Sequence, residues 1–201
     1  DDQIIGNHEP NREIQILHIH GYNGSVLPFW IANSLLVNLV SLDLEYCIKW
    51  KSLPSLQELN LLQHLKLQHL FQLEYMGLGL EELTDTNESG IVCLPRFLRS
   101  LIIGWCPNLK ILPTIPPSLE VLILKHVGFM VLPGIHQRES KTSVKSELTF
   151  VHIQSCAHLT SLDKGLLECQ EQLGSLSTLI ISHCESLRHL PRKSDRSHVV
   201  L

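Results

Sequence analysis

A six-residue pattern of apolar and variable positions recurs along the chain. Its first and third positions are apolar, and its sixth is a cysteine or another apolar residue. Alternation of this kind has the period of a short, half-buried strand. Seven segments follow the pattern, and each predicts one strand: LHIHGY at 17–22, LDLEYC at 42–47, LKLQHL at 65–70, LIIGWC at 101–106, LILKHV at 122–127, VHIQSC at 151–156 and LIISHC at 179–184.

The spacing of these segments indicates a repeat protein. They begin 25, 23, 36, 21, 29 and 28 residues apart, and five of the six intervals fall in the 20–29 window of leucine-rich repeats. Strands this short are stable only when neighbouring units stack. We therefore predict an α/β leucine-rich-repeat solenoid, or horseshoe, of about seven repeats. Its parallel strands should line the concave face, with loops or short helical turns on the convex face.

The predicted solenoid is a single domain over residues 1–201, with repeats at roughly 12–191 and a polar tail at 192–201. Residues 77–93 and 134–147 interrupt the rhythm with polar, charged sequence and predict surface loops, while GLLECQEQLG at 165–174 could form a short outer helix. The terminal repeats lack polar caps, and the first residues lack the features of a signal peptide. We therefore expect the chain to be part of a longer protein.

Composition excludes several classes of partner. Hydrophobic residues make up 44% of the chain but aromatic residues only 5%, so the core must be aliphatic. A net charge of −4 gives no indication of binding to nucleic acid or an anionic membrane. No apolar run approaches the roughly 18–20 residues of a membrane span.

Most of the six cysteines are explained by the repeat, because four lie at its sixth position and should be buried. Cys156 and Cys184 occupy that position in successive repeats, so stacking should bring them close. A disulfide is one possibility there, and two reduced thiols, favoured by a reducing compartment, are the other.

Three longer stretches carry a family resemblance: HIHGYNGSVLPFWI at 18–31, NLVSLDLEYC at 38–47 and SLRHLP at 186–191. Together with the cysteine that closes several strands, they resemble the leucine-rich-repeat domain of plant intracellular nucleotide-binding leucine-rich-repeat (NB-LRR) disease resistance proteins. The likeness covers about residues 12–191. The chain departs from this wording at Tyr22, Leu70 and Val127, where the cysteine is replaced, and it contains no G-x-x-x-x-G-K-[ST] loop.

The resemblance implies a cytoplasmic recognition and autoinhibitory module of an innate immune receptor. Such a module would sense a pathogen effector or a guarded host protein and contact an upstream nucleotide-binding domain, without a cofactor of its own. Substrate adaptors of the F-box ubiquitin ligase type also carry leucine-rich repeats that end in cysteine, and they are the alternative. The sequence that precedes Asp1 would distinguish a P-loop receptor from an F-box adaptor.

The variable positions of the pattern predict the binding surface. Strand alternation turns its second and fourth residues away from the core, and its fifth lies at the strand end. An acidic end, two lysines and an apolar centre with the composition of a binding hot spot follow one another along this face. The predicted partner-binding residues are Asp43, Glu45, Tyr46, Lys66, His69, Ile102, Trp105, Ile123, Lys125, His126, His152, Ile180 and His183.

No catalytic or metal site is predicted. The chain lacks a nucleophile motif such as G-x-S-x-G, so we expect no enzyme activity. A zinc site could use His152, Cys156, His158, His183 and Cys184, but the cysteines should face the core while the histidines face outward. These ligands would not converge on one ion.

Overall fold

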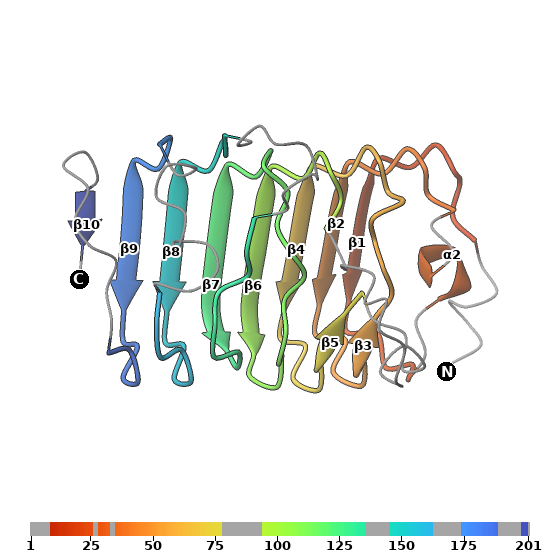
Figure 1. Ribbon diagram of the computed structural model, residues 1–201. Helices are drawn as coiled ribbons and strands as arrows, with labels where there is room; N and C mark the ends of the chain where they lie inside the picture. The colour runs from red at the N-terminus through yellow and green to blue at the C-terminus, as the bar shows by residue number, and fades with distance from the viewer. Residues whose placement is uncertain are drawn as a thin grey trace, which may run out of the picture.

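The computed structural model describes residues 9–25, 28–32, 35–77, 94–135, 145–162, 174–188 and 198–200. Its main element is a parallel sheet of eight strands in the order β1-β2-β4-β6-β7-β8-β9-β10 (Figure 1). The strands are β1 (Ile16–His20), β2 (Ser41–Glu45), β4 (His64–Gln68), β6 (Ser100–Cys106), β7 (Val121–Val127), β8 (Phe150–Gln154), β9 (Thr178–Ser182) and β10 (His198–Val200). Each of the seven predicted segments coincides with one of the first seven of these strands.

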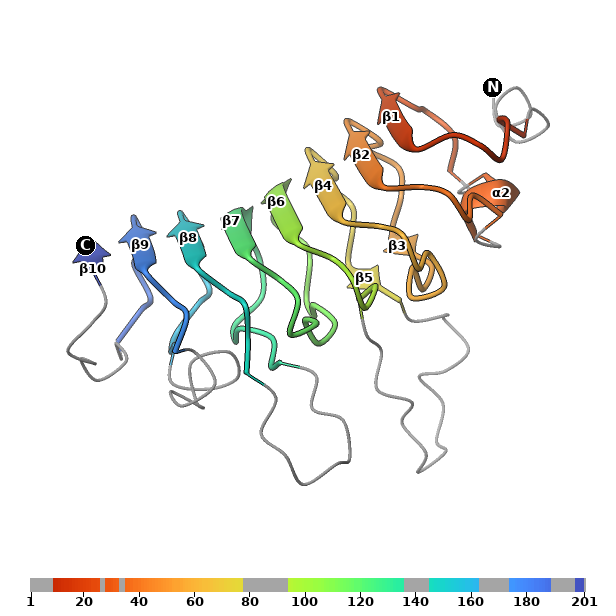
Figure 2. The same ribbon diagram turned by 90° about the horizontal axis from the view of Figure 1, so that it is seen from above.

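The strands line the concave side of a shallow arc, and the connections between them lie on the convex side (Figure 2). A second, two-stranded parallel sheet of β3 (Ser52–Leu53) and β5 (Tyr75–Met76) lies on the convex side. In the described part of the chain the only helix is α2 (Phe29–Ala32). The predicted leucine-rich-repeat solenoid is thus confirmed, and of the two possibilities for its convex face, loops or short helical turns, the described residues form almost entirely loops.

The core follows directly from the alternation of the pattern. In β7, Leu122 and Leu124 are fully buried while Ile123 between them is partly exposed. Each unit contributes the same positions, so the leucines of neighbouring units pack in continuous rows. A strand of five to seven residues gains its stability from this stacking rather than from its own length.

A left-handed residue at the fifth position ends most strands. The φ angles of Tyr46, His69, Trp105, His126, Ser155 and His183 lie between 51° and 56°, and the equivalent Gly21 has a φ of 67°. Such values are uncommon for residues other than glycine. Because the backbone turns here, the sixth residue points into the core, where Cys47, Cys106 and Cys156 are fully buried.

The chain then turns off the strand in the same way in several units. The amide of Leu109 donates to the carbonyl of Cys106 at 3.2 Å, and the amide of Leu159 donates to Cys156 at the same distance. Leu109, Leu112, Leu159 and Leu162 are buried. The threefold spacing of apolar residues after each strand is explained by this turn.

Several sequence expectations fall on parts of the chain that the structure does not fully describe. Most of the predicted loops at 77–93 and 134–147, and nearly all of the possible helix at 165–174, lie outside the described residues. Within the predicted polar tail, His198–Val200 forms β10, which pairs in parallel with β9. The sheet therefore has one strand more than the seven segments predict.

Candidate protein-binding surface

The second position of the pattern forms a continuous row across the sheet. Strand pairing places each of its residues directly beside the next, because all the units share one register. From β2 to β9 the row consists of Asp43, Lys66, Ile102, Ile123, His152 and Ile180. These six residues are all partly exposed on the concave face. The structure thus aligns six of the predicted residues.

The fifth position forms a stack of rings at the strand ends. The rings of Tyr46 and His69 are 4.1 Å apart and nearly parallel, at 3°. His69 and Trp105 follow at 5.9 Å and 9°, and Trp105 and His126 at 3.8 Å and 14°. We call these four residues the ring ladder. At about 4.8 Å per strand, the ladder extends for roughly 15 Å across β2, β4, β6 and β7.

The ring ladder leaves large apolar surface open to solvent. The side chains of Trp105 and Tyr46 have relative exposures of 45% and 40%. Tryptophan and tyrosine are enriched among the few residues that contribute most of the binding energy at protein interfaces. Ile102 and Ile123 pair with each other on β6 and β7, the strands that also carry Trp105 and His126 of the ladder, so the predicted apolar centre and the ladder share these two strands.

The ladder ends at His126, because the next residue at the fifth position carries no ring. Ser155 follows His126 at the fifth position and carries no ring, so exposed His183 on the next unit is separated from the stack. Lys125 lies at the fourth position of β7, between the two rows, and pairs in register with Gln154 of β8. Partial burial, reinforced by this lysine, lowers the pKa of His152.

Basic side chains lie on both sides of the two carboxylates at the predicted acidic end. Asp43 Oδ2 is 3.0 Å from Lys66 Nζ and also 3.0 Å from His18 Nδ1. Glu45 lies between two imidazoles, with Oε2 3.6 Å from Nδ1 of His20 and Oε1 3.8 Å from Nδ1 of His69. Asp43 and Glu45 thus lie in a mixed cluster of carboxylates, imidazoles and one lysine.

The sequence analysis did not include His18 and His20 among the binding residues. They are two residues apart on β1, so strand alternation places both on the concave face. Their relevance depends on the pairing of β1 with β2, which sets His18 beside Asp43 and His20 beside Glu45. The available signal was the alignment of LHIHGY with LDLEYC, which places His18 beside Asp43 and His20 beside Glu45; the sequence did not give the side-chain conformations that bring these groups together.

The four described cysteines at the sixth position are free thiols. Burial raises the pKa of Cys47 to about 11 and that of Cys106 to about 12, so neither is reactive near neutral pH. A hydrogen bond between Cys156 and Cys184 raises the pKa of buried Cys156 and lowers that of half-buried Cys184. The two are not bonded covalently, and Cys184 is more acidic than its place in the repeat suggested.

A hollow of about 560 Å³ opens at the amino ends of the strands, opposite to the end that carries the ring ladder. Arg96, Phe97, Arg99, Lys145 and Glu147 contribute to its lining. None of the predicted binding residues lies there. It mixes charges of both signs with one exposed ring, whereas the concave face carries the ordered rows, so the concave face remains the candidate surface.

No helix within the described ranges is long and apolar enough to cross a membrane.

The family model described as R13L1/DRL21 LRRs, where LRR denotes a leucine-rich repeat, matches residues 1–70.

The chain is also similar to several plant proteins along most of its length. Disease resistance protein RGA2 of Solanum bulbocastanum is 29% identical over 91% of this chain, and RPS4B of Arabidopsis thaliana is 27% identical over 82%. Disease resistance protein RRS1 of Arabidopsis thaliana is 26% identical over 94% of this chain. The chain spans 18%, 14% and 14% of the lengths of RGA2, RPS4B and RRS1. With the solenoid fold, these matches show a leucine-rich-repeat domain that is similar to parts of plant disease resistance proteins.

Proposed function

We propose that this domain is the protein-recognition and autoinhibitory module of a plant innate immune receptor. Its concave face would bind a pathogen effector or a guarded host protein and, in the resting receptor, a nucleotide-binding region of the same protein. We place this activity in the cytoplasm. The free thiols of Cys47, Cys106 and Cys156 are consistent with a reducing compartment.

The observation that carries the proposal is the exposed ring ladder beside Ile102 and Ile123. Apolar and aromatic groups on neighbouring strands form a rigid surface that loses little side-chain entropy on binding. The seven strands β1 to β9 of the main sheet extend for about 30 Å, which suits an interface of standard size, roughly 800 Å² per side. These features support binding rather than catalysis.

Competition for the concave face between the ligand and the nucleotide-binding region provides a mechanism by which that region is released. If the nucleotide-binding region occupies the ring ladder in the resting state, a ligand that binds the open state more tightly shifts the population toward it. The shift equals the difference between the ligand's affinities for the two states, and about 1.4 kcal/mol of difference changes the ratio tenfold. The relatives are disease resistance proteins, so we favour this function over that of an F-box adaptor.

The proposal is tested by co-precipitation from leaf tissue of this domain with the nucleotide-binding region of its own receptor. The double variant Trp105→Ala and Ile123→Ala removes the largest exposed ring and an adjoining apolar side chain. We expect it to weaken binding of the nucleotide-binding region about thirtyfold, the effect of losing one hot spot of roughly 2 kcal/mol, and to reduce its recovery accordingly.

Met130→Ala is the control, because Met130 is an apolar residue that is even more exposed than Trp105 but follows β7 and lies off the strand face. Circular dichroism should show the same fold in all variants. Recovery that is unchanged in the double variant would contradict the assignment of the ring ladder, and equal loss in Met130→Ala would show that the effect is unspecific.

A further inference from the structure

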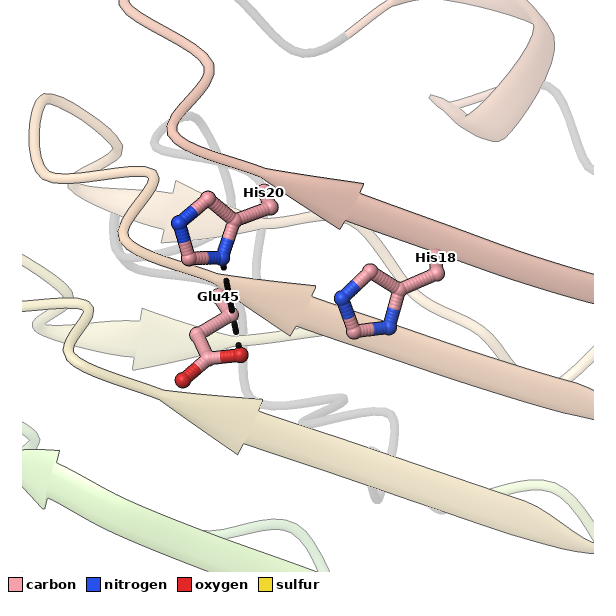
Figure 3. Close-up of side chains that lie close together, drawn as sticks. All are labelled: His18, His20 and Glu45. Carbon is pink, nitrogen blue, oxygen red and sulfur yellow. Dashed lines mark ion pairs between the residues drawn. The ribbon is translucent and has the colours of Figure 1, made fainter.

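Two histidines and a glutamate converge at the first two strands of the sheet. His18 and His20 project from the same face of β1, and Glu45 on β2 lies directly beside His20 in the strand register. Figure 3 shows both imidazole rings side by side, with the Glu45 carboxylate extending toward His20. We infer that His18, His20 and Glu45 form a binding site for a divalent transition-metal ion of the zinc class.

The distances between the three groups suit one ion. One ligand atom from each lies within 4.8 Å of the other two, and His20 Nδ1 is 3.6 Å from Glu45 Oε2. Tetrahedral zinc, with metal–ligand distances of about 2.0–2.1 Å, needs ligand atoms about 3.4 Å apart. The histidine side chains are 50% and 59% exposed, so small rotations can close the remaining gap, while Glu45, at 19%, is held in place.

The types of ligand select the metal. Two imidazole nitrogens and one carboxylate oxygen form a donor set that suits zinc and its neighbours in the first transition row. Calcium and magnesium prefer sites made of oxygen ligands, and thiolate sites favour softer ions. Three protein ligands leave a fourth position open to water or to a side chain of a bound protein.

The surroundings already orient one ligand. Nδ1 of His18 is 3.0 Å from Oδ2 of Asp43, which leaves Nε2 of His18 for the metal. A carboxylate that accepts from the second nitrogen of a metal-bound histidine is the usual supporting contact in such sites. Lys66 also pairs with Asp43 at 3.0 Å and holds this carboxylate in position.

Two buried polar atoms beside the cluster lack hydrogen-bond partners within the described part of the chain. Oδ1 of Asp43 and Nδ1 of His69 are buried without a hydrogen-bond partner among the described residues. Buried polar atoms in native proteins are normally satisfied, by protein groups, water or an ion. A hydrated ion at His18, His20 and Glu45 would bring water molecules to this part of the face.

The ion would connect two units of the solenoid. His18 and His20 belong to β1 and Glu45 belongs to β2, so binding links the strand at the edge of the sheet to its neighbour. This inference does not depend on the proposed immune function, because it concerns only these side chains. Metal bound to the folded state alone also raises its stability by mass action.

Calorimetric titration of the 201-residue chain with zinc chloride tests the site. We expect one zinc ion to bind per chain, and His20→Ala and Glu45→Gln each to lower the affinity by at least about tenfold, since even supporting contacts contribute that much. His152→Ala is the matched control, because His152 occupies on β8 the position that His18 has on β1 and lies outside the cluster. The zinc affinity of His152→Ala should remain within about twofold of that of the original protein.

Cobalt provides a second readout that does not depend on stability. Co²⁺ bound by four ligands absorbs strongly in the visible range, and His20→Ala should abolish this band while far-ultraviolet circular dichroism remains unchanged. The assignment would be overturned by absence of stoichiometric zinc binding, by full affinity in both cluster variants, or by an equal loss of affinity in His152→Ala.

Discussion

Left-handed backbone at one repeated position is the residue-scale feature that shapes this protein. Six non-glycine residues have φ angles between 51° and 56°. For an L-amino acid, this left-handed conformation costs about 1–2 kcal/mol relative to the right-handed one. The conformation persists because it returns the sixth residue to the core, where burial of an apolar side chain contributes about 1.5–3 kcal/mol. The same turn presents the fifth side chain at the strand end.

Ser155 provides a direct test of this balance. Ser155→Val should lower the free energy of unfolding by about 1–2 kcal/mol relative to Ser155→Gly, because a β-branched residue tolerates positive φ poorly and glycine adopts it freely. Urea titration of the two variants followed by circular dichroism measures the difference. Equal stability would mean that the φ of 53° at this position imposes no strain.

Alternation within each strand separates stability from recognition at the scale of the element. In β7, Leu124 is fully buried, whereas Ile123 is partly exposed in the row that includes Ile102 and His152. Each strand therefore contributes one set of side chains to the core and another to the concave face. Residues of the second set can change with little effect on the fold.

The two neighbouring residues of β7 should respond very differently to truncation. Leu124→Ala leaves a cavity between stacked units and should lower the free energy of unfolding by about 2–5 kcal/mol. Ile123→Ala should lower it by less than about 1 kcal/mol, because its side chain is already partly solvated. Chemical denaturation of both variants measures this contrast, and comparable losses would contradict the assignment of the two faces.

At the scale of the whole molecule, two successive units approach closely at the turns after β6 and β7. Gly128 follows β7, and a Cβ atom added there would lie 1.9 Å from the carbonyl oxygen of Pro107, in the turn after β6. The backbones of neighbouring units thus approach without an intervening side chain. A disturbance at this point affects the stacking on which every short strand depends.

Gly128→Ala should therefore destabilise the solenoid by about 1–3 kcal/mol, the usual penalty for overpacking. Gly134→Ala is its control, because an added Cβ there meets no atom within 4 Å. The control should stay within about 0.5 kcal/mol of the original protein, as surface substitutions do. Thermal unfolding of the pair tests the contact, and equal midpoints would show that the turns adjust freely.

The sequence was sufficient for the parts of the structure that follow from periodicity. Alternation located the seven strands, and the cysteine at the sixth position was correctly predicted to face the core at Cys47 and Cys106. The ring ladder was only partly foreseen, because its residues were identified but their parallel stacking depends on left-handed φ values. The repeat pattern places His18 and His20 beside Asp43 and Glu45, but the cluster also depends on the side-chain conformations that bring His18, His20 and Glu45 within reach of one another, and no sequence pattern encodes these.

The exposure of Trp105 gives this protein an optical property of its own. The chain has three tryptophans, of which Trp30 and Trp50 are buried at 3% and 1% exposure. Iodide in solution should quench the emission of Trp105 selectively, and a protein that covers the ring ladder should protect it and shift that emission to shorter wavelength. Occupancy of the concave face can thus be followed by intrinsic fluorescence, without attaching a dye.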